Sequence, residues 1–156
     1  MIIQIVGYKD SGKTTLMAHT IRLLKQHNLT VVTIKHHGHH GEEITLQHQE
    51  VDHMKHLHAG ADQSIVQGHQ YQQTITRQCN QSLKDVIDKS VTIDYDIILV
   101  EGYKLAEFDK IIVYRNEKDL TQLQALSNVR YSINLSDAQA LTKFDSWLLD
   151  WIEIKG

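Results

Sequence analysis

An eight-residue run near the start of the chain, Gly7-Tyr8-Lys9-Asp10-Ser11-Gly12-Lys13-Thr14, fits the pattern G-x-x-x-x-G-K-[ST]. Glycines at both ends allow the backbone to curl closely around an anion, while the lysine supplies a cation and the hydroxyl a Mg²⁺ ligand. An apolar run precedes the pattern and a helix-like run follows it, which is the strand–loop–helix context of a phosphate-binding loop. These residue types therefore predict a nucleoside triphosphate site, with Lys13 on the β- and γ-phosphates and Thr14 on Mg²⁺.

A phosphate-binding loop of this type works with an acidic residue at the end of a neighbouring apolar strand. The run Ile97-Ile98-Leu99-Val100 ends in Glu101, and Gly102 follows it. Glu101 is therefore the predicted second group of the metal site. Because a glutamate is one methylene longer than the usual aspartate, we expect it to contact Mg²⁺ through a water molecule.

A second apolar run, residues 29–34, ends in Lys35 and His36. Open α/β sheets bind ligands at the carboxyl ends of their strands, so these two side chains are expected to face the same mouth as the glycine loop. They could contact phosphate or a second substrate, and a solvated surface pair is the alternative.

Helical and strand patterns alternate along the chain. Strands are expected at residues 2–6, 29–34, 63–67, 71–77, 96–100, 110–114 and 128–133, with the pair 63–67 and 71–77 antiparallel; helices are expected at 13–27, 50–59, 82–89 and 136–152, with Asn80 and Ser136 as N-caps. The alternation predicts an α/β fold with a mostly parallel sheet and helices on both faces, the three-layer arrangement of P-loop NTPases.

Bulk properties limit the remaining possibilities. A chain of 156 residues with 41% hydrophobic content suits a single domain, residues 1–156. A formal charge of −3 gives no general affinity for nucleic acid. No apolar run of membrane-spanning length or signal peptide is visible, and the single Cys79 fits a reducing compartment as an inert thiol. We therefore expect a cytoplasmic protein without membrane contact.

Four segments together resemble one family. They are residues 7–15, the run Ile34-Lys35-His36-His37-Gly38-His39-His40, the segment 52–61 that ends in Ala59-Gly60-Ala61, and Leu99-Val100-Glu101-Gly102-Tyr103-Lys104. In this order they are similar to the MobB family of molybdopterin-guanine dinucleotide biosynthesis adaptor proteins. The resemblance covers about the first 115 residues, and the last 40 carry little motif.

This resemblance implies a GTP-binding protein with weak GTPase activity and Mg²⁺ as its metal. It also implies a homodimer that acts beside a molybdenum cofactor guanylyltransferase, with molybdopterin or its guanine dinucleotide as a second ligand. The residues expected to bind nucleotide are Gly7, Tyr8, Lys9, Asp10, Ser11, Gly12, Lys13, Thr14, Thr15, Lys35 and His36; Lys13 and Glu101 are the catalytic candidates, and Thr14 and Glu101 are the metal candidates.

Base recognition is where the chain departs from the family pattern. Relatives carry an Ala-Ser-Asp-like stretch late in the chain, whereas the nearest segment here is Ala125-Leu126-Ser127-Asn128, with Asn128 in place of the acid. The guanine signature N-K-x-D is absent. Asn116-Glu117-Lys118-Asp119 has its lysine in the wrong place, and we interpret this segment as a turn.

Nine of the eleven histidines lie between residues 36 and 69. This cluster keeps a second function open, a nickel or zinc metallochaperone GTPase, because imidazoles are good ligands for both metals. The histidines could instead line a site for an anionic pterin phosphate. A third possibility is an ATP-dependent small-molecule kinase, since a phosphate-binding loop does not read the base.

Overall fold

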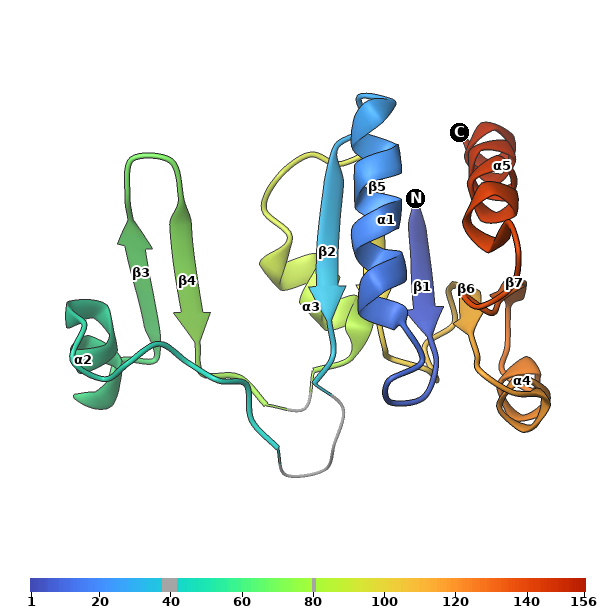
Figure 1. Cartoon of the computed structure of the whole chain (residues 1–156). Coiled ribbons are helices and arrows are strands. Elements are labelled where there is room, and N and C mark those ends of the chain that lie inside the picture. Colours follow the sequence, from blue (N-terminus) through green and yellow to red (C-terminus); the bar gives the residue numbers. More distant parts are fainter. Residues whose placement is uncertain (38–41, 80) are drawn as a thin grey trace.

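The computed structural model describes residues 1–37, 42–79 and 81–156. Its centre is a five-stranded parallel sheet with the strand order β2-β5-β1-β6-β7 (Figure 1). The strands of this sheet are β1 (Ile2–Val6), β2 (Val31–Lys35), β5 (Ile97–Glu101), β6 (Asp109–Val113) and β7 (Val129–Ile133). The helices around it are α1 (Lys13–Gln26), α3 (Leu83–Ser90), α4 (Glu117–Gln124) and α5 (Ala140–Lys155).

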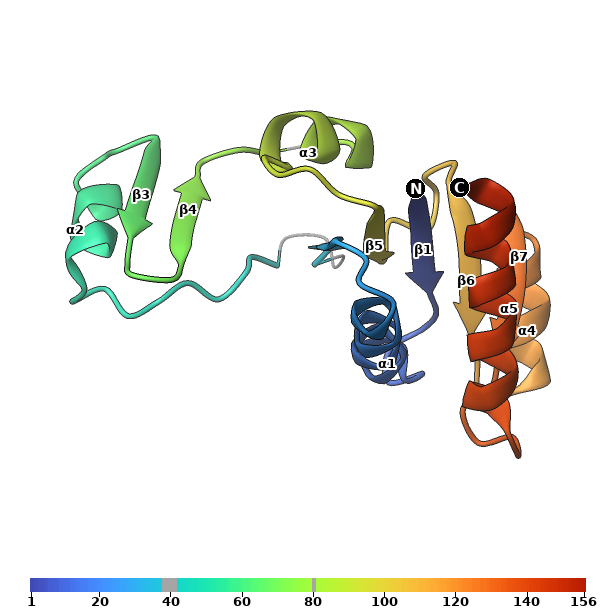
Figure 2. The same ribbon diagram turned by 90° about the horizontal axis from the view of Figure 1, so that it is seen from above.

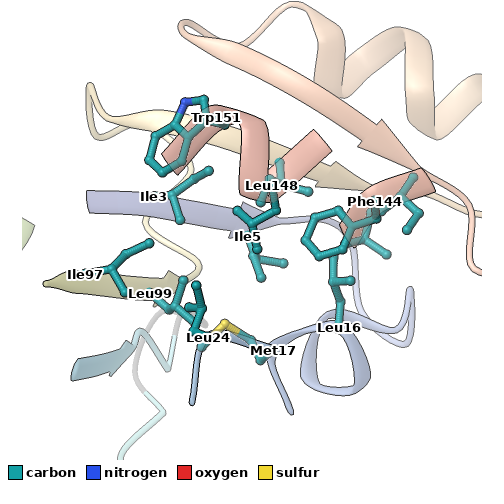
Figure 3. Packing of buried hydrophobic residues seen from close by; sticks show 13 residues of the cluster. Ile3, Ile5, Leu16, Met17, Leu24, Ile97, Leu99, Phe144, Leu148 and Trp151 are labelled. Atoms are coloured by element: carbon teal, nitrogen blue, oxygen red, sulfur yellow. The ribbon is translucent and has the colours of Figure 1, made fainter. Parts of the chain in front are cut away.

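Helices α1 and α5 cover one face of the sheet. Alternate residues of the central strands, such as Ile3, Ile5 and Leu99, point to this face and pack against side chains of the two helices, including Leu16 and Phe144 (Figure 3). All five of these side chains are fully buried. Burial of this apolar surface is the main force that fixes α1, and with it the end of the glycine loop, against the sheet.

Helices α3 and α4 cover the opposite face. Leu83 of α3 packs with Ile98 and Val100, while Leu123 of α4 packs with Val6 and Ile112. Figure 2 shows α1 and α3 on opposite sides of the sheet. The predicted three-layer α/β fold with helices on both faces is confirmed. In the described part of the chain, no helix is long and apolar enough to cross a membrane.

A small α/β arm lies beside the β2 edge of the central sheet (Figure 1). It consists of α2 (Asp52–His58), β3 (Gln63–Gln67) and β4 (Gln72–Thr76). The two strands pair antiparallel, as predicted, and form their own sheet. Met54 and Leu57 of α2 are buried, so this helix supplies the arm with a core of its own.

The predicted turn at residues 116–119 is wrong, because Asn116 caps helix α4, which begins at Glu117. The side-chain oxygen of Asn116 accepts a hydrogen bond from the backbone N–H of Asp119 at 2.9 Å, the geometry of a helix N-cap. The helix escapes notice in the sequence because Leu120 and Leu123 are its main apolar positions, which is too little to show a helical period.

The predicted start of the last helix at residue 136 is also wrong. Ser136 does not cap it; its N–H donates to Asn134 Oδ1 at 3.0 Å, and the helix begins at Ala140 after Gln139, whose φ is +59°. Strand β2 begins at Val31 rather than at residue 29, because Asn28 adopts a left-handed conformation with φ of +59° just after α1. Ser82 caps α3, and the proposed cap Asn80 lies outside the described residues.

Candidate functional site

The parallel strands all end at one edge of the central sheet, where a cleft of about 1310 Å³ opens. The glycine loop follows β1, Lys35 ends β2 and Glu101 ends β5. Every predicted site residue lines this cleft: Gly7, Tyr8, Lys9, Asp10, Ser11, Gly12, Lys13, Thr14, Thr15, Lys35, His36 and Glu101. The fold therefore gathers three separate sequence segments into one place.

The glycine loop needs both of its glycines. A Cβ atom on Gly7 would collide with the backbone oxygen of Val113 and stand 2.6 Å from Ser11 Oγ. Gly12 has φ of +100°, a left-handed conformation that side chains disfavour, and a Cβ there would meet Leu135 at 2.6 Å. The loop thus keeps the curled form that brings its backbone amides toward an anion.

Helix α1 begins at the end of this loop without a side-chain cap, and its first turn carries no acidic residue. Its first amide donors and the positive end of its dipole are therefore available to an anion in the cleft. Lys13 lies in the same turn, and its Nζ donates to Tyr8 O at 2.6 Å. Burial lowers the pKa of Lys13, and the nearby ammonium groups of Lys104 and Lys35 add to the effect, against the opposing influence of the Glu101 carboxylate.

Glu101 joins the loop to the end of β2. Its side chain is nearly buried, at 10% exposure. Oε2 accepts a hydrogen bond from Thr14 Oγ1 at 3.4 Å, and Oε1 lies 3.3 Å from Lys35 Nζ. The parallel register that sets Lys35 beside Glu101 creates this pairing. A hydroxyl and a carboxylate form a donor set that suits Mg²⁺.

The spacing of these two oxygens indicates how they could share one ion. Adjacent ligands of an octahedral Mg²⁺ lie about 2.9 Å apart, because its bonds are about 2.0–2.1 Å long. The 3.4 Å between Thr14 Oγ1 and Glu101 Oε2 is wider than that. Thr14 and Glu101 are thus the residues that would hold Mg²⁺ here, and as they stand their two oxygens are too far apart to be adjacent direct ligands.

Two aromatic contacts close the other wall of the cleft. The Tyr103 ring stacks on the His36 ring with centroids 4.3 Å apart and an interplanar angle of 26°. Lys104 Nζ lies 4.3 Å from the centroid of the Tyr8 ring, a cation–π contact. The Tyr8 hydroxyl donates to Gln122 Oε1 of α4 at 2.7 Å, so the glycine loop is tied to both the segment after β5 and helix α4.

The structure adds residues that sequence reasoning missed and removes one from consideration. Arg115 and Lys104 line the cleft, and Arg115 could have been found because it directly follows a predicted strand of the central sheet. Asn128 lies at the amino end of β7, where its side chain donates to Glu107 O. This is the edge of the sheet opposite the cleft, so Asn128 does not take part in base recognition at this site.

The histidine cluster is divided between two places. His36 and His37 line the cleft, whereas His53 and His56 line a groove of about 550 Å³ on the arm. His39 and His40 lie outside the described residues. Over residues 1–37, 42–79 and 81–156, no three His, Cys, Asp or Glu side chains form a group that could hold a metal ion.

Comparison with known proteins identifies relatives along most of the chain. A protein from Bacillus subtilis named probable molybdopterin-guanine dinucleotide biosynthesis adapter protein is 32% identical over 148 residues, which is 92% of this chain and 84% of that protein. The molybdopterin-guanine dinucleotide biosynthesis adapter protein of Haemophilus influenzae is 31% identical over 74% of this chain and 64% of its own length.

Solved structures agree with the sequence matches. A MobB protein homolog from Bacillus stearothermophilus superposes with a TM-score of 0.73 at 27% identity, covering 98% of both chains. Bacillus subtilis MobB gives a TM-score of 0.71 at 26% identity over 96% of both chains. The family described as MobB, molybdopterin guanine dinucleotide synthesis protein B, matches residues 2–133. The chain therefore belongs to the MobB family.

Proposed function

We propose that this protein binds GTP with Mg²⁺, hydrolyses it weakly, and assists the attachment of GMP to molybdopterin in the synthesis of molybdopterin guanine dinucleotide. The observation that carries the proposal is the convergence of Lys13, Thr14 and Glu101 in one cleft of a MobB-family fold. The names of the Bacillus subtilis and Haemophilus influenzae relatives, which describe adapter proteins of this biosynthesis, support the pathway.

In this proposal, the first turn of α1 and Lys13 bind the phosphates, and Mg²⁺ would be held by Thr14 directly and by Glu101 through water. Mg²⁺ would neutralise charge on the β- and γ-phosphates. The residues that line the cleft in the described part of the chain include no glutamine to orient an attacking water. Turnover by the isolated protein should therefore be slow, below about 1 per minute, as in small GTPases without an activating partner.

The site assignment is tested by titrating a fluorescent GTP analogue into the wild type and into Lys13→Ala. Loss of a charge-assisted contact worth about 1.5–3 kcal/mol predicts an affinity lower by about ten- to a hundred-fold. Lys25→Ala is the matched control, because Lys25 is an exposed lysine at the far end of the same helix. Equal affinities of Lys13→Ala and wild type would refute the site.

Competition between GTP and ATP for the same site tests the choice of base. Preference for ATP would replace the GTPase proposal with an ATP-dependent activity.

The pathway is tested by adding the protein to a purified molybdenum cofactor guanylyltransferase with molybdopterin and GTP, under conditions where the transferase alone is slow. We expect faster formation of the dinucleotide with wild type than with Lys13→Ala. We further propose that this work takes place in the cytoplasm, in keeping with an unpaired Cys79.

We also propose that the protein is a homodimer and that the arm forms the contact. Exposed apolar side chains gather on the arm and on the segment that leads into it: Ile44, Leu46, Val51, Ile65 and Tyr71. A two-stranded sheet is marginally stable by itself, and exposed apolar groups close together commonly mark a protein contact. A second copy of the chain would cover this surface with an identical surface of its own.

Analytical ultracentrifugation of Ile65→Lys tests the dimer. Ile65 is 58% exposed, so the lysine should not disturb the monomer, but burying its charge in an interface would be costly. Ile154→Lys is the control, because Ile154 is 83% exposed on α5. We expect only Ile65→Lys to shift the mass to that of a monomer; a monomeric wild type would exclude the proposed contact.

A further inference from the structure

Two polar side chains lie completely buried on one face of the central sheet. Gln4 in β1 and Lys110 in β6 are both 0% exposed, and they are direct neighbours across the two parallel strands. A buried amide or ammonium group is costly unless its donors find acceptors. An aliphatic side chain would serve packing alone at either position, so the partners of these two groups indicate what they do.

Both side chains donate to the segment that connects β5 to β6. Gln4 Nε2 donates to Gly102 O at 2.9 Å and to Tyr103 O at 2.6 Å. Lys110 Nζ donates to Phe108 O at 3.1 Å and also to Ala106 O. Two buried side chains therefore hold four carbonyl groups of residues 102–108 from the inside of the molecule.

The part of this segment that Gln4 holds has an unfavourable backbone. Gly102 has φ of +97° and Tyr103 has φ of +51°, so two successive residues are left-handed, and the second carries a side chain that disfavours this conformation. Gln4 Oε1 has no hydrogen-bond partner among the described residues although it is buried. The amide is thus placed for its two donor bonds to this turn, at the expense of its own acceptor.

The outer side of the same turn is a wall of the nucleotide cleft. Glu101 precedes it, the Tyr103 ring stacks on His36, and Lys104 lies over the Tyr8 ring. Through these contacts the turn connects the glycine loop with the end of β2. Gln4 lies in the strand that leads directly into the glycine loop, so its two bonds join the two halves of the cleft beneath its floor.

We propose that Gln4, supported by Lys110, is a positioning residue for the nucleotide site. Its amide holds the Gly102–Tyr103 turn in its left-handed form, and the turn in its place holds Glu101, Tyr103 and Lys104 against the ligand. The proposal rests on the proposed function only in taking GTP with Mg²⁺ as that ligand. Gln4 touches neither the ligand nor the metal and acts through the turn.

The test compares Gln4→Met, which keeps the length of the side chain but loses both donors, with Thr20→Val. Thr20 is equally buried, and its hydroxyl bonds only within α1, to Leu16 O. Hydrogen exchange measured by mass spectrometry should become about tenfold faster or more in residues 102–108 of Gln4→Met, because the turn opens more often, while β1 and β5 stay protected. Thr20→Val should leave residues 102–108 as slow as in wild type.

Two further readouts separate positioning from simple destabilisation. The His36 ring proton signals in NMR should move in Gln4→Met, because the Tyr103 ring no longer stacks on it, and the affinity for GTP with Mg²⁺ should fall about tenfold. If Gln4→Met does not fold, Gln4→Asn, whose amide is one methylene short of the turn, is measured in its place and should give the same pattern at smaller size.

The outcomes distinguish this proposal from the proposed function. Exchange and NMR require no nucleotide, so a wild type that fails to bind GTP would overturn the function and leave the turn measurable. Unchanged exchange in residues 102–108 of the folded variant would overturn the role of Gln4. Faster exchange with unchanged GTP affinity would overturn it as well, because the turn would then be held by Gln4 without serving the site.

Discussion

Glu101→Gln offers the sharpest test of the metal site, because the change keeps the shape of the side chain and removes only its charge. The carboxylate faces Thr14 Oγ1 at 3.4 Å and Lys35 Nζ at 3.3 Å. If it holds a Mg²⁺-bound water, its loss removes a charge-assisted hydrogen bond worth about 1.5–3 kcal/mol. The affinity for GTP in the presence of Mg²⁺ should therefore fall by about ten- to a hundred-fold.

Without Mg²⁺ the same variant should behave differently. Coulomb's law for charges 3.3 Å apart gives about 1 kcal/mol with water-like screening and about 5 kcal/mol at an effective dielectric constant of 20. Lys35 is 61% exposed, so the smaller figure applies and the fold should lose little stability. Lys35, released from Glu101, can then face the phosphates, and GTP should bind in EDTA as well as it does to wild type or better.

The measured quantity is the ratio of GTP affinities with Mg²⁺ and with EDTA, obtained with a fluorescent analogue. We expect this ratio to collapse at least about tenfold in Glu101→Gln. Glu42→Gln is the control, since Glu42 lines the same cleft but lies beside His37, away from Thr14. A wild-type ratio in Glu101→Gln would refute the reasoning and leave Glu101 as a structural partner of Lys35.

Three further predictions follow from the structure. Gly7→Ala should abolish detectable GTP binding in a fluorescence titration, because its Cβ has no room beside the end of β6; retained binding would mean that the loop can open at little cost. Burial would raise the pKa of Asp109, but hydrogen bonds from Arg130 and Lys155 outweigh it and hold the pKa below its usual value. Asp109→Asn should therefore lower the free energy of unfolding by about 2 kcal/mol near neutral pH. In denaturant titrations this difference from wild type should vanish as the pH falls below about 3.8 and through the native pKa of Asp109. A difference that persists in acid would contradict the prediction. The pKa of Lys13 is lowered in the free protein and should rise when a triphosphate binds. Calorimetry at alkaline pH should therefore show proton uptake on binding, and the affinity should weaken as the pH rises through the pKa of Lys13 in the free protein. If no protons are taken up, Lys13 does not contact the phosphates.

Much of the fold and of the site was predictable because it depends on local signals. Continuous apolar runs such as residues 97–100 are typical of buried parallel strands, and the carboxyl ends of such strands meet at one edge. This rule alone brought Lys35 and Glu101 to the glycine loop, and the structure has them in register and 3.3 Å apart. Neither the strand order nor this distance had to be known beforehand.

What the sequence did not reveal depends on contacts between distant residues. In the sequence, Gln4 is a polar residue within an apolar strand. Its burial is explained only by the structure, in which residues 102–108 place two carbonyl groups next to its amide. Helix α4 has a short apolar stripe, and its role becomes clear only in the structure, where Leu123 packs against Ile112 of β6. The sequence predicted the helix and the two strands of the arm, but it gave no sign that α2 packs against β3 to form a separate unit.

The charge of the cleft connects its geometry to the kind of ligand it suits. The chain has a formal net charge of −3, yet Lys13, Lys35, Lys104 and Arg115 all line one cleft whose nearly buried acid is Glu101. Cations held close together repel one another, and burial also disfavours their charged forms, which lowers the pKa of Lys13 and of Lys104. A compact ligand with several negative charges relieves that repulsion, whereas an extended polyanion would also meet the rest of a chain whose net charge is negative. The same arrangement of charge thus supports the ligand that we propose, a nucleoside triphosphate with its metal ion.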